Sequence, residues 1–585
     1  MSTAVVKKWV PSTESQPLKC GDAIVSFLRK LDVTQVFGVP GGSIEPFFDA
    51  VARASREAPI EMVVARHESG AAFMADGYAR ERRKIGVCCS TTGPGATNLM
   101  TGVSSAYVDN IPMLVITAQT PMPKFGRKAL QDSSCSAVDL VGMFKHCTKY
   151  SSLVSHADQI IPKLIAAVQA ANAYPKGPVH LSFPADLINQ PLSFEPDYRL
   201  DMLTDDYSLV DLNALDKLLP EIVQAKKIAL FLGDNCEGAS EEIIRFAERV
   251  NATIISGPMG KRWVNEYHPQ YAGVFGFSGH AKARRLVMDQ QYDLMIAIGA
   301  KLSEIGTNGW EAKLINEKLI HIDSIQEHFC RSGTARLHVL GGLTSIFKQL
   351  NERLAKLARM PWQATRPLQF QESLFSEDEN ALCEGSHYPI KPQRLYSSLA
   401  KMLPEDSRVF IDAGNAWAWA TRYFQRRDNL GRYRIAMGYG SMTWAIGASV
   451  GSCVANPSSP HLCITGDGSY LMSGQEITVA LQQNIPLVML VVNDNSLGMV
   501  KHGQRLGGAE QIGYELPQIN FAAIAESMGI EGIVIDTVEQ LDQLDFSRLF
   551  SKQQPTLLDV RIDAEEVPPM GERVKGLATS KNTCE

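Results

Sequence analysis

The chain of 585 residues lacks the features that mark several classes of protein. Its eleven cysteines include no CxxC pair, and only Cys88 and Cys89 are neighbours, so the sequence indicates neither a zinc site nor a disulfide framework. The net charge is −6, and no long block carries charge of one sign. We therefore expect no nucleic-acid partner and no membrane-surface partner.

Long hydrophobic runs are missing as well. The apolar run that begins at Ile485 is far shorter than the ~20 residues that a membrane-spanning helix needs. The stretch before Leu18 has no apolar core of the signal-peptide kind. With 45% hydrophobic and 21% charged residues, the composition is that of an ordinary globular protein. These absences predict a cytoplasmic protein without a membrane span.

What the sequence does contain is one pattern, repeated three times. Apolar strands alternate with amphipathic helices, and this alternation predicts an α/β fold of three doubly wound domains, each with a parallel sheet covered by helices on both faces. Such sheets bind ligands beyond the carboxyl ends of their strands, so we expect the chemistry there. The predicted domains are residues 18–191, 209–357 and 391–563, with polar linkers at 193–208 and 358–389 and a polar tail at 564–585.

Two carboxylates follow neighbouring strands of the third domain. Asp467 lies in a GDG turn after a buried strand, and Asp494 follows a helical stretch and a second buried strand. The 24 residues of 469–492 return the chain to the same edge of the sheet, so the two side chains should lie side by side. A lone GDG would more simply be a tight turn. Paired with Asp494, and with a backbone carbonyl near Ser496 as a third ligand, it predicts a Mg²⁺ site.

The GDG and Asn-Asp spacing resembles the signature of thiamine-diphosphate-dependent enzymes. The resemblance implies thiamine diphosphate, bound through Mg²⁺, and a carboxyl group from the first domain that hydrogen-bonds the pyrimidine ring of the cofactor. Glu68, in ARHESGAAFMADGYAR, fits that place; the simpler interpretation is a Glu favoured by a helix dipole. The resemblance also implies that Met437 is an apolar wedge under the bent cofactor, although a core methionine would look the same. The remaining implied cofactor contacts are Gly41, Gly414, Asn415, Ala416, Gly466, Gly468, Ser469, Leu497, Gly498 and Met499.

Several segments resemble the acetolactate synthase branch of this family. They are VFGVPGGSIEP, the stretch after Gly93-Pro94-Gly95, and LQDSSCSAVDL, in which Gln131 is the implied catalytic residue. The resemblance implies that a pyruvate-derived hydroxyethyl group is joined to a second 2-oxo acid or another carbonyl acceptor. Another thiamine-dependent acyloin synthase, an acetyltransferase or a 2-hydroxyacyl lyase is the alternative. A thiamine fold without catalysis is a further alternative, against which the presence of Glu68, Asp467 and Asp494 argues.

Three residues depart from that branch. Gly503 stands where biosynthetic acetolactate synthases have a tryptophan that helps to select the acceptor, and Leu130 replaces a phenylalanine. Lys301 replaces an arginine of the flavin-binding middle domain, so the sequence leaves FAD open; GFSGHAKA (276–283) and HIDSIQ (321–326) keep the outline of a nucleotide site. Lys501 and His502 either recognise an acidic acceptor or lie in a solvated loop.

The resemblance also bears on assembly. In this family the cofactor lies between the first domain of one subunit and the third domain of another. We therefore expect a homodimer or a homotetramer that acts on small 2-oxo acids. The sequence does not indicate whether a regulatory subunit exists.

Overall fold

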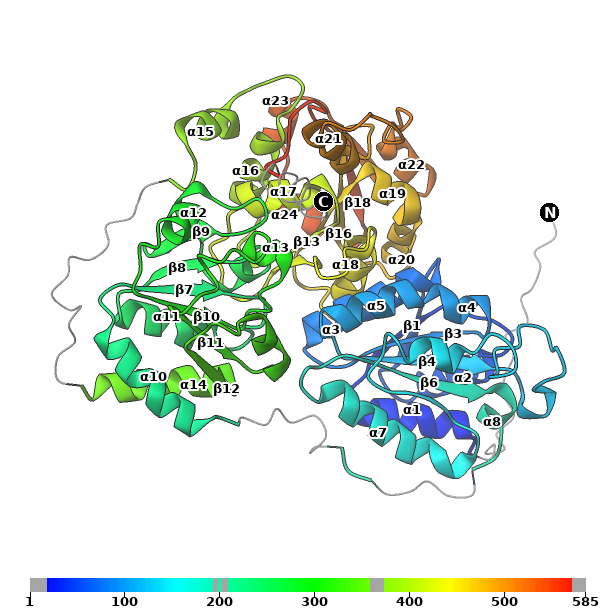
Figure 1. Ribbon diagram of the computed structural model, residues 1–585. Coiled ribbons are helices and arrows are strands. Elements are labelled where there is room, and N and C mark those ends of the chain that lie inside the picture. The colour runs from blue at the N-terminus through cyan, green and yellow to red at the C-terminus, as the bar shows by residue number, and fades with distance from the viewer. Residues whose placement is uncertain (1–17, 193–197, 201–208, 358–372, 571–585) are drawn as a thin grey trace.

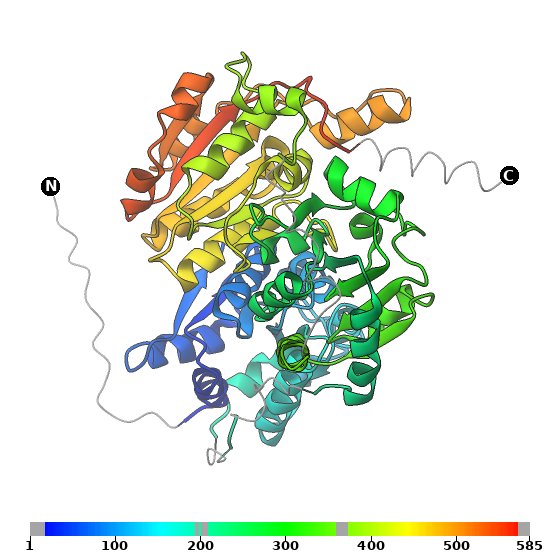
Figure 2. The same ribbon diagram turned by 90° about the vertical axis from the view of Figure 1, so that its left-hand side faces the viewer.

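The computed structural model describes residues 18–192, 198–200, 209–357 and 373–570. It contains three six-stranded sheets in which every pair of neighbouring strands is parallel, and this confirms the predicted α/β fold. Most of the first predicted linker, part of the second and the tail beyond Met570 lie outside the described residues. In Figures 1 and 2 the third domain lies directly on the first, and the middle domain lies alongside both. No described helix is both long and apolar enough to cross a membrane.

The first sheet has the strand order β2-β1-β3-β4-β6-β5. Its strands β3, β4 and β6 are buried along their whole length, as their continuous apolar runs predict for a sheet covered on both faces. The strands are β1 Gln35–Gly38, β2 Glu61–Val64, β3 Gly86–Ser90, β4 Met113–Gln119, β5 Ser151–Leu153 and β6 Pro178–Pro184; the α-helices are α1 Cys20–Lys30, α2 Glu45–Ala54, α3 Glu68–Arg82, α4 Pro94–Asn98, α5 Met100–Val108, α6 Leu140–Phe144, α7 Ile160–Asn172 and α8 Ala185–Ile188.

The middle sheet has the order β12-β11-β10-β7-β8-β9. Strands β7 and β10 are fully buried and pair over five residues each. The strands are β7 Ile228–Leu232, β8 Thr253–Ser256, β9 Tyr271–Val274, β10 Leu294–Ile298, β11 Leu319–Asp323 and β12 Leu337–Leu340; the helices are α10 Leu212–Gln224, α11 Ser240–Arg249, α12 Ala281–Met288, α13 Glu304–Thr307 and α14 Leu343–Ala355.

The third sheet has the order β14-β13-β15-β16-β18-β17, so the two strands before Asp467 and Asp494, β15 and β16, are direct neighbours. The strands are β13 Arg408–Ile411, β14 Tyr433–Ile435, β15 His461–Gly466, β16 Leu487–Asn493, β17 Glu531–Ile535 and β18 Thr556–Arg561; the helices are α15 Glu377–Glu384, α16 Pro392–Met402, α17 Asn415–Tyr423, α18 Trp444–Ala455, α19 Asp467–Ser473, α20 Ile477–Gln482, α21 Gly498–Gly507, α22 Phe521–Ser527, α23 Val538–Asp542 and α24 Phe546–Ser551.

One part of the predicted linker 358–389 is a helix. Helix α15 begins after Ser376, whose side chain forms a capping box with Glu379. Glu379 also accepts hydrogen bonds from Arg422 Nε (2.5 Å) and from the Tyr423 hydroxyl (3.0 Å) on α17. The polar composition that suggested a linker therefore includes residues that attach this helix to the third domain.

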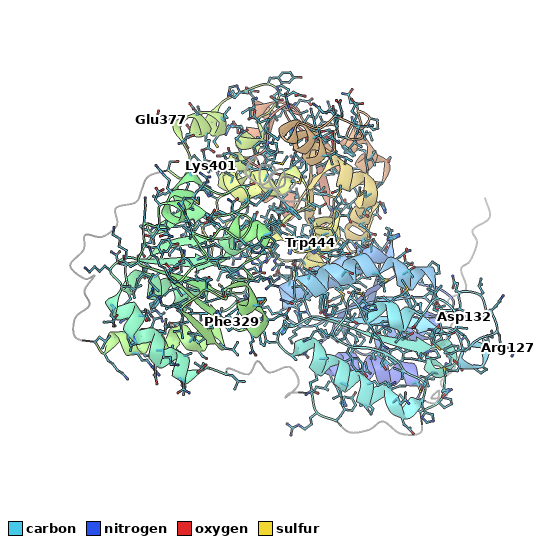
Figure 3. The ribbon with its side chains drawn as sticks, in the orientation of Figure 1. Arg127, Asp132, Phe329, Glu377, Lys401 and Trp444 are labelled. Carbon is cyan, nitrogen blue, oxygen red and sulfur yellow. The ribbon has the colours of Figure 1, made fainter. Side chains whose placement is uncertain are left out.

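Helices α3 and α18 hold the first and third domains together. Small residues line their contact, since a Cβ atom at Gly77 would overlap the Ala448 carbonyl and one at Gly451 would overlap that of Met74. At the same contact Trp444 Nε1 donates to Asp76 Oδ1 (3.2 Å), and Figure 3 shows Trp444 where the two domains meet. The glycine and alanine pattern of α3 thus serves a close helix crossing between domains.

Replacing Gly77 with alanine is expected to force these helices apart. The added methyl group meets backbone, which cannot move aside as a flexible side chain can, so the free energy of unfolding should fall by about 1–3 kcal/mol. Urea unfolding measures the change. Gly42→Ala is the control, because no atom lies within 4 Å of a Cβ there. An equal effect of both substitutions would contradict the role of the crossing.

Candidate functional site

Asp467 and Asp494 lie side by side at the carboxyl edge of the third sheet. Oδ2 of Asp467 accepts hydrogen bonds from the backbone N–H groups of Asp494 (3.3 Å) and Ser496 (3.2 Å). Oδ1 of Asp494 accepts from the hydroxyl (2.9 Å) and the backbone N–H (3.1 Å) of Ser496. The adjacent strands β15 and β16 thus bring the three residues of the predicted metal site together.

The two carboxylates carry the electrostatic pattern of a cation site. Burial, and after it the charge of Asp494, raises the pKa of Asp467 to about 7, and burial raises the pKa of Asp494 to about 6. Neither carboxylate forms an ion pair with a Lys or Arg in the described part of the chain. That part also holds no cluster of three or more His, Cys, Asp or Glu side chains suited to a metal. Two carboxylates with further oxygens from a carbonyl, water and phosphate fit Mg²⁺.

Open backbone surrounds this pair. No atom lies within 4 Å of a Cβ built on Gly414 or Gly466, so a ligand has room to approach both strand ends. At Gly498 a Cβ would instead overlap the side-chain nitrogen of Asn415, so α21 begins in direct contact with α17. Oδ1 of Asn415 is buried and has no partner among the described residues. This arrangement fits a phosphate group held on the metal beside exposed backbone.

The other predicted cofactor contacts of the third domain surround the same edge. Ala416 lies in the first turn of α17, and a Cβ on Gly468 would lie 2.5 Å from Leu497 Cδ2. Ser469 is buried, and Met499 is partly buried against the core. Met437 is buried, and the next residue, Gly438, lies against Val108 and Asp109 of the first domain.

Asp412 is a residue of this edge that sequence reasoning missed. It is fully buried; its Oδ2 accepts from Thr443 N (3.0 Å) and Thr465 Oγ1 (2.9 Å), and its Oδ1 accepts from Ala445 N (3.2 Å). It thereby joins the ends of β13 and β15 to the segment that follows Met437. A carboxylate directly after the strand RVFI was the signal that could have found it, by the strand-end rule that selected Asp467.

The first domain contributes a second group of predicted residues. Glu68 begins α3, and its Oε2 accepts a hydrogen bond from Asn98 Nδ2 (3.0 Å). Gln131 has φ of 57°, and its carbonyl accepts from Thr92 Oγ1 (3.1 Å). A Cβ on Gly41 would lie 2.7 Å from Thr91 Cβ. Glu68, Gln131 and Gly41 therefore gather around the turn that follows β3.

These two groups form separate clusters of hydrogen bonds in the described part of the chain, and we call each cluster a half-site. Among the described residues no hydrogen bond or ion pair joins Glu68 or Gln131 to Asp467 or Asp494. The loop that carries Gln131 is exposed, and Leu130 keeps 91% of its surface accessible. Figure 3 shows Arg127 and Asp132 at the outer rim of the first domain, away from the third.

Glu476 is a second residue that sequence reasoning missed. It lies in the turn Gly474–Glu476, is fully buried, and its Oε1 accepts from the backbone N–H groups of His67 (2.9 Å) and Arg66 (3.2 Å), next to Glu68. Burial raises its pKa to about 7. It joins the third domain to the start of α3.

Glu476→Gln is expected to change how stability depends on pH. A carboxyl group with pKa near 7 in the folded protein and about 4.5 in the unfolded chain stabilises the fold at low pH, and this contribution is lost as pH rises through 7. As pH rises from 4.5 to 8, the wild type should therefore lose up to about 3 kcal/mol of its free energy of unfolding relative to the variant. Urea unfolding at both pH values measures it, with exposed Glu526→Gln as control. A difference in free energy of unfolding that is the same at both pH values would contradict a raised pKa of Glu476.

The segment around Gly503 is covered by the start of the predicted tail. Lys501 Nζ donates to the Ala564 carbonyl (3.1 Å) and pairs with Glu565 (2.6 Å), and His502 is buried. The interpretation that Lys501 and His502 lie in a solvated loop is therefore wrong. A Cβ on Gly503 would meet only Met570 Cε, at 3.9 Å, so the place of the tryptophan is open.

In the middle domain, Lys301 is held in an ion pair. Its Nζ lies 3.1 Å from Asp234 Oδ2 and donates to the Val108 carbonyl (3.0 Å). In 276–283, His280 accepts from Val274 N (3.0 Å) and lies 3.0 Å from the Arg422 carbonyl. In 321–326, Asp323 is fully buried. A cleft of about 450 Å³ is lined by Asp234, Lys301 and Val108 among these residues.

Three family models match the chain, and together they cover both half-sites. They are the thiamine pyrophosphate enzyme N-terminal TPP binding domain at residues 18–140, the central domain at 215–350 and the C-terminal TPP binding domain at 412–560. The chain is similar to the probable acetolactate synthase large subunit of Methanocaldococcus jannaschii, with 30% identity over 575 residues, 94% of this chain and 93% of the relative. It is equally similar to the acetolactate synthase large subunit of Haemophilus influenzae, with 30% identity over 568 residues and 94% and 96% coverage. The isozyme 2 large subunit of Escherichia coli is 30% identical over 559 residues, with 93% and 97% coverage.

Proposed function

We propose that this chain, which belongs to the thiamine pyrophosphate enzyme family and within it to the acetolactate synthase large subunits, decarboxylates pyruvate and joins the remaining two-carbon unit to a second carbonyl compound. With pyruvate as acceptor the product is 2-acetolactate. The observation that carries the proposal is the adjacent pair of carboxylates, buried Asp467 and half-buried Asp494, which has no Lys or Arg ion-pair partner in the described structure.

The metal proposed for this pair is Mg²⁺, held by Asp467, Asp494 and the backbone carbonyl of Ser496. Its positive charge would stabilise the ionised forms of both carboxyl groups, whose pKa values are raised mainly by burial. The diphosphate would lie against the open backbone at Gly414 and Gly466, and the remaining contacts would come from Asn415, Ala416, Gly468, Ser469, Leu497, Gly498 and Met499. When bound, thiamine diphosphate supplies the carbon that attacks the substrate carbonyl and the electron sink for decarboxylation.

Glu68 is the proposed proton carrier. Asn98 donates to its Oε2 and so fixes the carboxyl group, which leaves Oε1, next to Gly95, as the atom that takes up and returns a proton. Met437 would be the apolar wedge under the bent cofactor. The Gln131 amide is proposed to bind the substrate, and its loop is exposed and directed away from its own third domain, as a residue that serves another copy would be.

The oligomer proposed on these grounds is a homodimer or a homotetramer in which Glu68 of one copy meets Asp467 of the next. The separation of the two half-sites within one chain supports it. A cytoplasmic location is proposed as well, because the ten cysteines of the described residues are all free, as a reducing compartment requires.

Product analysis tests the function. The protein is incubated with pyruvate, thiamine diphosphate and Mg²⁺, alone and with a panel of aldehydes and 2-oxo acids, and the products are identified by mass spectrometry. We expect CO₂ release that requires both cofactors, and 2-acetolactate from pyruvate alone. CO₂ release with a product only from another acceptor would favour an acyloin synthase or acyltransferase, which the open space at Gly503 supports as the second candidate. Absence of CO₂ release under all conditions would refute both.

A further inference from the structure

The cleft of about 450 Å³ is formed by all three domains. Tyr107 and Val108 come from the first domain, Phe231 and Ile305 from the middle domain, and Met437 with Gly438 from the third. Its lining is therefore largely apolar, and it reaches the residue proposed to support the cofactor. The volume lies within the ~300–1,000 Å³ of small-molecule sites.

The residues at the first strand end beside this cleft do not fit the diphosphate of FAD. A dinucleotide diphosphate binds where a glycine-rich turn lets backbone N–H groups approach it. After β7 this chain has a single glycine, Gly233, and then Asp234, whose carboxylate is paired with Lys301 at 3.1 Å. Burial alone would raise the pKa of Asp234, but the charges of Lys301 and Arg262 lower it, so the carboxylate stays ionised and its ion pair with Lys301 occupies the turn that a diphosphate would have to approach.

The acidic side chain that would bind the ribose of FAD is also already hydrogen-bonded within the middle domain. Dinucleotide sites use an acidic side chain at a strand end to bind ribose hydroxyl groups. Here that side chain is Asp323, the last residue of β11, and it is fully buried. Its Oδ2 lies 2.9 Å from His328 Nδ1, and its Oδ1 accepts from Ile325 N (2.9 Å) and Asn235 Nδ2 (3.3 Å). Both oxygens of this carboxylate are therefore already hydrogen-bonded within the domain.

We propose that the cleft holds the apolar body of a bulky 2-oxo acid acceptor instead of FAD. This inference rests on the proposed function, in which the donor, pyruvate, is too small to fill the cleft. Met437 and Gly438 connect the cleft to the cofactor side. The charged lining residues are four cations and three carboxylates, which leaves a small excess of positive charge: Lys149, Lys176, Lys301 and Arg331 against Asp234, Glu304 and Glu327. The reaction needs no oxidant: the C1–C2 bond of pyruvate breaks as CO₂ leaves, a C–C bond forms to the acceptor carbonyl carbon, and the acceptor oxygen gains a proton.

Filling the cleft tests the inference. Gly306 lines it, and a Cβ there would meet only Ser303 Oγ, at 3.4 Å, so Gly306→Leu adds volume at little cost to the fold. Gly333→Leu is the matched control, because Gly333 lies in the same domain, outside the cleft, with no atom within 4 Å of a Cβ. The KM for phenylpyruvate as acceptor should rise at least about tenfold in Gly306→Leu. Turnover of pyruvate alone, and both reactions of the control, should change less than about twofold.

Binding measurements separate this inference from the proposed function. Isothermal titration of phenylpyruvate into the Mg²⁺ and thiamine diphosphate complex should show weaker binding to Gly306→Leu whether or not turnover occurs. In equilibrium dialysis the wild type should not retain FAD, and Asp234→Gly should retain more of it than the wild type. Tight FAD retention by the wild type, or phenylpyruvate binding that Gly306→Leu leaves unchanged, would overturn the inference. Loss of CO₂ release from pyruvate alone would count against the proposed function only.

Discussion

Asp467→Asn is expected to lower the rate of pyruvate decarboxylation by about 100-fold to several thousand-fold. Asparagine keeps the shape and the hydrogen bond from Ser496 N but removes one of the two negative charges that would hold the metal. Removing one partner of a buried ion pair, here the carboxylate that would pair with Mg²⁺, costs about 3–5 kcal/mol. A free-energy cost of this size corresponds to the expected loss in rate. The loss should appear mainly as a higher Mg²⁺ requirement and weaker binding of thiamine diphosphate, measured by fluorescence titration.

The control for this prediction is Asp545→Asn in the same domain. Asp545 caps α24, and its side chain accepts from Arg548 N (3.0 Å), a place where asparagine is about as good a helix cap. The charge change is therefore the same, but the metal site is untouched. If Asp467→Asn bound Mg²⁺ and thiamine diphosphate as the wild type does, the metal assignment would be wrong.

Glu68→Gln is expected to separate cofactor binding from catalysis. The amide oxygen still accepts from Asn98 Nδ2, so the side chain stays in place, but it no longer exchanges a proton. General acid and base catalysis contributes about 100-fold to 10,000-fold, and the rate should fall within that range. Affinity for thiamine diphosphate should change by less than about threefold, as titration in the presence of Mg²⁺ would show.

Glu61, on the strand that precedes α3, provides the comparison for Glu68. Glu61 is exposed at the start of β2, so Glu61→Gln changes the same functional group without reaching the half-site. It should keep the activity of the wild type. If Glu68→Gln turned over at the wild-type rate, Glu68 would not be the proton carrier. The assignment of the half-site in the first domain would then be wrong as well.

The fold could be predicted from the sequence except at the edges of the sheets. Apolar runs in the sequence identify every central strand and the edge strands β2 and β12, but they do not identify β5, β9, β14 and β17, all of which lie at an edge. An edge strand has one neighbour and is short or incompletely buried: β5 has three residues of intermediate exposure, and β17 begins with an exposed Glu531. Such strands lack the continuous apolar run that identifies a strand buried on both faces.

The site could be predicted where a local rule applied. Asp467 and Asp494 each follow a buried strand, so their spacing was sufficient to place them side by side. The role of Glu476 could not be predicted in this way, because its hydrogen bonds reach Arg66 and His67, some four hundred residues earlier in the chain. The ion pair of Asp234 with Lys301 is likewise a contact between separate strands, and only the folded domain shows that it occupies the turn after β7.

Mixing the two inactive variants tests most directly whether Glu68 and Asp467 form one active site across two copies of the chain. Glu68→Gln and Asp467→Asn subunits are unfolded and refolded together, or co-expressed, and assayed for CO₂ release from pyruvate. In a hybrid dimer one site combines both substitutions and the other has neither, so random association should restore about a quarter of the wild-type activity. No recovery, with hybrid dimers present by native mass spectrometry, would contradict the shared site.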